Sequence, residues 1–152
     1  MVETDTGLFT VAVFQDAAWA ERALAALKQA GFSTDMLTIL AKDRSDASAL
    51  IEKTFGSAPE QIDLGAAGAV VYRGSLVDVL QGSARDLSKL GLASTMRRVG
   101  FQAHDSRIFE ALTGRGGVLV AVRTESRAAD ALALFHSYGG GNAAIGAWSG
   151  RV

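Results

Sequence analysis

The chain has 152 residues and no cysteine, and its 15 basic and 16 acidic residues give a net charge of −1. Balanced charge provides no electrostatic attraction to nucleic acid or to anionic membranes, so neither is an expected partner. Without cysteine the chain has no disulfide, no thiolate metal ligand and no thiol nucleophile. With 49% hydrophobic residues it can bury a core, and its length suits one domain, residues 1–152.

A cytoplasmic location is expected from the apolar segments. The first apolar run, residues 8–14, is too short for a signal peptide and lacks a basic flank. The most apolar region, residues 64–80, is interrupted by Arg73 and Asp78. No stretch is therefore long enough and free enough of charge to predict a membrane span.

Residues 8–41 have the pattern of a β-α-β unit. Residues 8–14 alternate as in a strand and are followed by Asp16, a favourable helix N-cap. Apolar residues then recur at helical spacing, and Gly31 can end the helix in the left-handed conformation. Residues 36–41 complete the unit as a second predicted strand.

Residues 116–149 repeat this pattern. A strand is predicted at residues 118–122, helix capping at 124–126, a helix end at the glycines 139–141 and a last strand at 143–148. The order of the matching features favours an internal duplication. Tandem β-α-β units predict an α+β fold, a ferredoxin-like tandem repeat with four antiparallel strands and two long helices on one face.

The first strands of the two units should form the central pair, and each should have two apolar faces. The face toward the long helices is expected to carry Phe9, Val11, Val13, Val118, Val120 and Val122. The opposite face is expected to carry Leu8, Ala12, Phe14, Leu119 and Ala121. That face is too apolar for water, so we expect a homodimer to cover it, with the segment between the units as the alternative cover.

Residues 42–115 form a mainly helical insertion between the two units. The predicted elements are a helix from Ser45 or Asp46 to Phe55 ended by Gly56, an amphipathic helix containing Leu76, Leu80, Ala84 and Leu87, and a helix capped by Asp105 or Ser106 and closed by Gly114. A stretch of small residues at 65–69 leads into Val70–Tyr72.

Two parts of the chain resemble the bacterial heat-induced, general-stress protein family, whose biochemical function is unknown. Thr10–Phe14, Ala20–Ala23 and Leu27–Phe32 resemble its first half, and Phe109–Leu112 with Arg115–Val122 resembles its second half. The resemblance implies an association with stress responses. It implies no reaction, ligand or catalytic residue.

The sequence contains no combination of nucleophile, base and acid typical of an enzyme, so we predict no catalytic residue, no metal site and no cofactor. The candidates for ligand binding are Arg97, Arg98, His104, Arg107 and Arg115. A histidine beside Asp105 could act as a base or a metal ligand, and the arginines could bind an anion. An N-cap role for the aspartate and a solvated basic surface are the alternatives.

Three functions remain open from the sequence. The first is a stress-associated, non-catalytic protein that acts by binding or self-association. The second is a small-molecule-sensing regulatory domain, because paired β-α-β modules commonly hold ligands at strand edges or dimer seams. The third is a dimeric α+β barrel enzyme or haem binder that uses His104 or His136.

Overall fold

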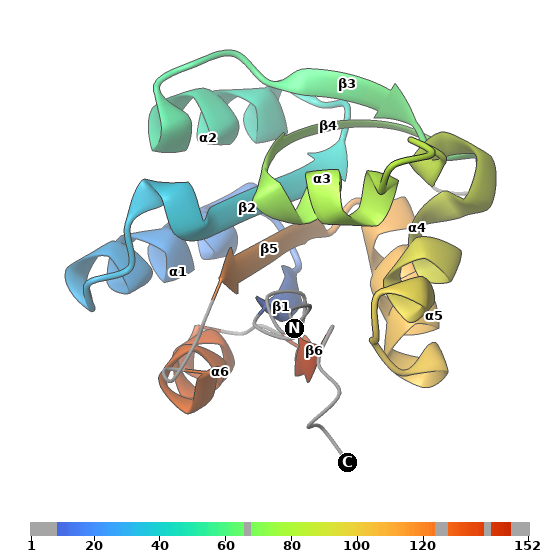
Figure 1. Ribbon diagram of the computed structural model, residues 1–152. Coiled ribbons are helices and arrows are strands. Elements are labelled where there is room, and N and C mark those ends of the chain that lie inside the picture. Colours follow the sequence, from blue (N-terminus) through green and yellow to red (C-terminus); the bar gives the residue numbers. More distant parts are fainter. Residues whose placement is uncertain (1–8, 66–67, 124–127, 139–140, 147–152) are drawn as a thin grey trace.

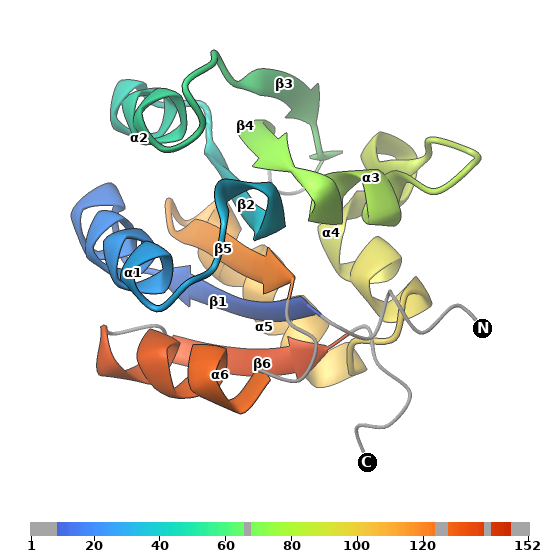
Figure 2. The same cartoon turned by 60° about the vertical axis from the view of Figure 1, so that its left-hand side comes forward.

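One antiparallel sheet lies between two layers of helices in the computed structural model, which describes residues 9–65, 68–123, 128–138 and 141–146 (Figure 1, Figure 2). Six strands run in the order β3-β4-β2-β5-β1-β6, and each neighbouring pair is antiparallel. The strands are β1 (Phe9–Phe14), β2 (Leu37–Lys42), β3 (Glu60–Asp63), β4 (Ala69–Gly74), β5 (Val118–Arg123) and β6 (Gly141–Gly146).

The helices divide into two groups, one on each face of the sheet (Figure 2). One face is covered by α1 (Ala17–Gln29), α2 (Ser45–Phe55) and α6 (Ala128–Ser137), and the other by α3 (Ser75–Gln81), α4 (Leu87–Arg98) and α5 (Ala103–Gly114). A short 3-10 helix, η2 (Thr34–Met36), precedes β2. The predicted α+β class is confirmed. No helix of the described residues is long and apolar enough to cross a bilayer.

Several helix ends follow the predicted signals. The Asp16 carboxylate accepts a hydrogen bond of 2.9 Å from the Trp19 amide and caps α1. Gly31, which follows the α1 C-cap, has a φ of 101°, and Gly56 ends α2 with a φ of 75°. These helix ends were predictable because caps and left-handed glycines are local features.

The central strands pair as predicted, but the predicted matching of their faces is wrong. Val11 lies opposite Ala121, and Ala12 lies opposite Val120. Residues directly opposite each other on paired strands point to the same face. The odd-numbered residues of both strands therefore face α3–α5, and the even-numbered residues face α1, α2 and α6. Phe9, Val11 and Val13 thus lie on the face opposite to the one predicted.

The sheet face predicted to be open is covered by the chain's own insertion. Leu8 lies outside the described residues. Leu119 and Ala121 lie on this face, whereas the strand register places Ala12 and Phe14 on the face of α1, α2 and α6, opposite to the one predicted. All four side chains are at most 1% exposed. Intramolecular packing therefore makes this surface unavailable for the predicted homodimer, and dimerisation itself stays a prediction. The residues that cover the face from the insertion include Leu76, Leu80, Leu92, Met96 and Phe109.

The insertion also departs from the predicted elements. The single amphipathic helix predicted around Leu76–Leu87 is wrong, because α3 ends before Gly82, whose φ of 63° breaks it, and α4 begins at Leu87. The last helix, α5, begins at Ala103 with Gln102 as its N-cap. Asp105 and Ser106 therefore lie inside the first turn.

Some predictions lie partly outside the described residues. The capping region at 124–126, two of the three glycines at 139–141 and the end of the last strand cannot be compared. The described part of β6 begins at Gly141, before the predicted residue 143.

Candidate functional site

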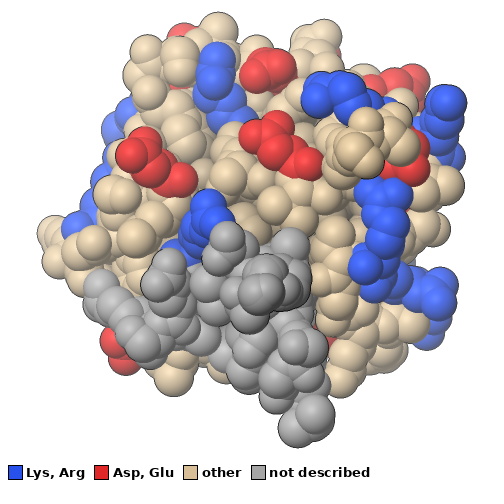
Figure 3. All heavy atoms as spheres, viewed as in Figure 1, with Lys and Arg blue, Asp and Glu red and all other residues tan. Residues whose placement is uncertain are grey.

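The five predicted ligand-binding residues lie on α4 and α5 and at the C-cap of α5. Arg97 is exposed in the last turn of α4. His104 and Arg107 are exposed on α5, and Arg115 is exposed at its C-cap. Their spacing places these last three residues on one helix face. Lys and Arg side chains gather on the α4–α5 side of the molecule, at the right of Figure 3.

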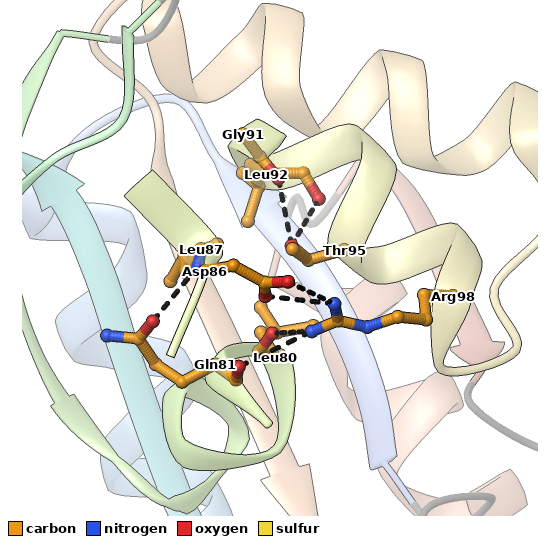
Figure 4. Close-up of polar contacts among 8 residues, drawn as sticks. All are labelled: Leu80, Gln81, Asp86, Leu87, Gly91, Leu92, Thr95 and Arg98. Carbon is orange, nitrogen blue, oxygen red and sulfur yellow. Dashed lines mark hydrogen bonds and ion pairs between the residues drawn. The ribbon is translucent and has the colours of Figure 1, made fainter. Parts of the chain in front are cut away.

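Arg98 has a structural role, which separates it from the other four. Its Nη1 donates to both carboxylate oxygens of Asp86, at 2.9 and 3.0 Å, and its Nη2 donates to the Leu80 carbonyl at 2.5 Å (Figure 4). The Gln81 side-chain oxygen also accepts from the Leu87 amide at 3.0 Å. These contacts join the end of α3 to α4.

The two histidines are exposed helix residues. His104 is the second residue of α5, and His136 lies near the end of α6. In the described ranges, no group of three or more His, Cys, Asp or Glu residues is arranged to hold a metal ion.

A shallow hollow of about 230 Å³ lies beside the break in α4. Gly91 has a φ of 87° there, and Glu110 Oε2 accepts from the Ala93 amide at 3.2 Å. Thr95 Oγ1 donates to the carbonyls of Gly91 and Leu92 in the same turn (Figure 4). The break at Gly91 leaves the first amide groups of the following turns without helical partners, and the Glu110 carboxylate accepts a hydrogen bond from one of them. This contact gives Glu110 a structural role.

A second hollow, the β2–β4 hollow, has a volume of about 290 Å³ and unpaired charged groups. It lies where η2, the start of β2, the end of α2 and the end of β4 come together. Its lining residues come from these elements and from the loop after α2. They are Thr34, Asp35, Leu37, Phe55, Ser57, Arg73 and Gly74.

Close backbone packing fixes one wall of the β2–β4 hollow. Gly74 pairs with Thr38 of β2 and has a φ of 129°. A Cβ atom on Gly74 would lie 2.3 Å from Thr38 Oγ1 and 2.5 Å from the Leu37 carbonyl oxygen, so only glycine fits. Thr38 Oγ1 accepts from the Leu76 amide at 3.0 Å, which positions the start of α3.

Arg73 is the cationic group of the hollow. It lies opposite Ile39, so it leaves the sheet on the face that α2 covers. The side chain is half-buried, and its Nε donates to the Ala58 carbonyl at 2.7 Å. Within the described part of the chain it makes no other hydrogen bond and no ion pair. Both terminal nitrogens are therefore available to a ligand.

Asp35 is the anionic group of the same hollow. It is exposed in η2, and it makes no hydrogen bond or ion pair with any other described residue, Arg73 included. Phe55 is half-buried against the core, Leu37 is buried, and Ser57 adds an exposed hydroxyl. The hollow thus combines opposite charges with an apolar wall.

One feature of the sequence points to this site. Arg73 interrupts an otherwise apolar run and directly precedes a glycine. A charge at the end of a buried strand is costly unless it is paired or reaches solvent or a ligand. Its convergence with Asp35 and Phe55 depends on the pairing of β2 with β4.

Comparison of the chain with known protein families, curated proteins and solved structures finds no match.

Proposed function

We propose that the chain is a non-catalytic binding protein that holds a small anionic group in the β2–β4 hollow. The observation that carries the proposal is Arg73, a half-buried arginine that lines the hollow and is held through Nε by the Ala58 carbonyl, with no other partner among the described residues. A guanidinium whose plane is already fixed loses little entropy when it binds a carboxylate or phosphate through two parallel hydrogen bonds.

Arg98 provides an internal comparison. Its terminal nitrogens are used by Asp86 and Leu80, as expected of an arginine that serves the fold. Arg73 has no such partners among the described residues. The difference favours a ligand role for Arg73 over a purely structural one.

We further propose that the core is a ferredoxin-like duplication. Supporting this, β2, β5, β1 and β6 are consecutive in the sheet, and each unit contributes a strand-helix-strand segment with its helix on the same face. The insertion adds β4 beside β2, and this addition supplies Arg73 to the hollow. The binding site would then be a product of the insertion.

The resemblance to general-stress proteins supports a role during stress. On this proposal, abundance of the protein rises after heat shock, which quantitative immunoblotting of the source cells measures. Unchanged abundance across heat, osmotic and oxidative stress would argue against the stress association and leave the ligand proposal intact.

Ligand binding is tested by thermal-shift measurements with acetate, phosphate, succinate, free amino acids and nucleotides. At least one compound should raise the melting temperature of the parent, because a ligand of the native state stabilises it. Arg73→Gln should remove that shift, and Arg97→Gln, an exposed arginine outside the hollow, should retain it. The proposal fails if no compound acts on the parent, or if Arg73→Gln responds as the parent does.

A further inference from the structure

The β2–β4 hollow places opposite charges at two positions along its lining. Arg73 comes from the end of β4 and Asp35 from η2, which precedes β2. They do not form an ion pair with each other, although both line the same hollow. A ligand that carries only an anion would use Arg73 and leave the Asp35 carboxylate beside its own negative charge.

The remaining lining fits a compact organic body. The half-buried Phe55 ring offers apolar surface, while the Thr34 and Ser57 hydroxyls can donate or accept hydrogen bonds. The volume of about 290 Å³ is at the small end for ligand pockets, which run from roughly 300 to 1,000 Å³. A nucleotide would exceed this space, whereas a molecule of amino-acid size fits it.

We infer that the hollow binds a free α-amino acid with an apolar side chain. This inference rests on the proposed anion-binding role of Arg73 and names the ligand class for that site. The ligand carboxylate accepts hydrogen bonds from the Arg73 terminal nitrogens, and its ammonium group donates to the Asp35 carboxylate. The side chain contacts Phe55.

Three compounds with one carbon skeleton separate these contacts. Leucine carries both charges, 4-methylpentanoate lacks the ammonium group, and 3-methylbutylamine lacks the carboxylate. Titrations into ¹⁵N-labelled protein, followed through the Gly74 amide and Arg73 Nε–H signals, detect binding up to millimolar dissociation constants. Leucine should bind at least tenfold more tightly than either analogue, because each analogue loses a charge-assisted contact. The other apolar amino acids are titrated in the same way.

Two variants assign the contacts to residues. Arg73→Gln should weaken leucine binding by about tenfold to a hundredfold. Asp35→Asn removes a charge from an exposed residue with no bond to maintain, so folding is preserved. It should weaken leucine binding by about tenfold and leave 4-methylpentanoate binding unchanged or tighter. Asp78→Asn on α3, outside the hollow, is the matched control and should bind as the parent does.

The outcomes distinguish this inference from the proposed function. If 4-methylpentanoate, acetate or phosphate binds as tightly as every apolar amino acid, the hollow is an anion site, and only the amino-acid inference is overturned. Leucine binding that Asp35→Asn does not weaken would overturn it as well. If no tested anion or amino acid shifts the Gly74 and Arg73 signals, both the inference and the proposed function fail.

Discussion

Arg97 and Arg98 are neighbours in the last turn of α4. Only Arg98 reaches Asp86 and the Leu80 carbonyl. Replacing Arg98 with alanine removes charge-assisted hydrogen bonds and leaves the carbonyl without this partner. We expect Arg98→Ala to lower the free energy of unfolding by about 1–3 kcal/mol.

Urea denaturation of Arg98→Ala and Arg97→Ala provides the measurement. The Arg97 side chain is exposed and makes no hydrogen bond or ion pair with another described residue, so its removal should change stability by less than about 0.5 kcal/mol. Equal effects from the two substitutions would show that the contacts joining α3 to α4 contribute little.

Gly74 is the residue whose replacement should be most costly among the glycines of the insertion. A Cβ atom added at Gly74 would lie 2.4 Å from the Cα atom of Thr38, which is too close for two carbon atoms. The φ of 129° is also unfavourable for any residue with a Cβ atom. Gly65 has a comparable left-handed φ of 68° and open space around a Cβ atom, so it is the matched control. We expect Gly65→Ala to cost about 1–2 kcal/mol and Gly74→Ala more than about 3 kcal/mol. Thermal melts of both variants test this, and similar melting temperatures would refute the close approach of β2 and β4.

Tyr72 gives the molecule a predicted alkaline sensitivity. Burial raises the pKa of its phenol above the ordinary value of 10.0, and the carboxylates of Glu60 and Asp78 act in the same direction. The folded state therefore holds the phenol proton more tightly than the unfolded state. This contribution to stability is complete below pH 10.0 and is lost as pH rises from there through the higher folded pKa.

Tyr72→Phe has no phenol to ionise, so its stability should fall less steeply above about pH 10. Urea midpoints between about pH 8 and 11 measure the difference, with Tyr138→Phe measured alongside as a second phenol deletion. Parallel curves for the parent and Tyr72→Phe would contradict the expected ionisation.

At the scale of the elements, local signals were readable from the sequence and pairing was not. Asp16, Gly31 and Gly56 act within one turn of chain, and each was placed correctly. The face of β1 was placed wrongly, because alternation fixes only which residues of one strand share a face. The register between the two strands, which places Val11 opposite Ala121, decides which residues of β1 share a face with which residues of β5.

The candidate site was missed for a related reason. Arg73, Asp35 and Phe55 belong to three separate elements, and only the pairing of β2 with β4 brings them to one hollow. The arginines proposed instead lie close in sequence. In the structure Arg98 bonds to Asp86, and Arg115 is exposed at the C-cap of α5.

The helix α5 provides the cover for the sheet face that appeared open from the sequence. Phe109 is fully buried and packs edge-to-face with Phe101, with ring centroids 6.2 Å apart. Phe109→Ala should lower the free energy of unfolding by about 3–5 kcal/mol, because the cavity cannot close completely. Arg107→Ala, on the exposed side of α5, is the control and should be nearly neutral in the same urea titration. A mild effect at Phe109 would mean that α5 does not cover the sheet in solution.

At the scale of the whole molecule, two helix layers share one sheet and should unfold together. Leu27 of α1 is fully buried on the layer opposite Phe109. Leu27→Ala should lower the free energy of unfolding by about 2–5 kcal/mol. Phe109→Ala and Leu27→Ala should each unfold in a single transition at a lower urea concentration than the parent. Far-ultraviolet ellipticity and tryptophan fluorescence should report the same midpoint for each variant. A second transition in Phe109→Ala alone would show that α3–α5 unfold independently.

The strand order has a consequence for synthesis of the chain on the ribosome. Both neighbours of β1 in the sheet, β5 and β6, come from residues 118–146, so residues 15–117 are made between β1 and its first partner strand. During translation both hydrogen-bonding edges of β1 are therefore without their native partners until β5 has been made. Unpaired strand edges promote aggregation, so we expect β1 to be the strand most in need of protection during synthesis.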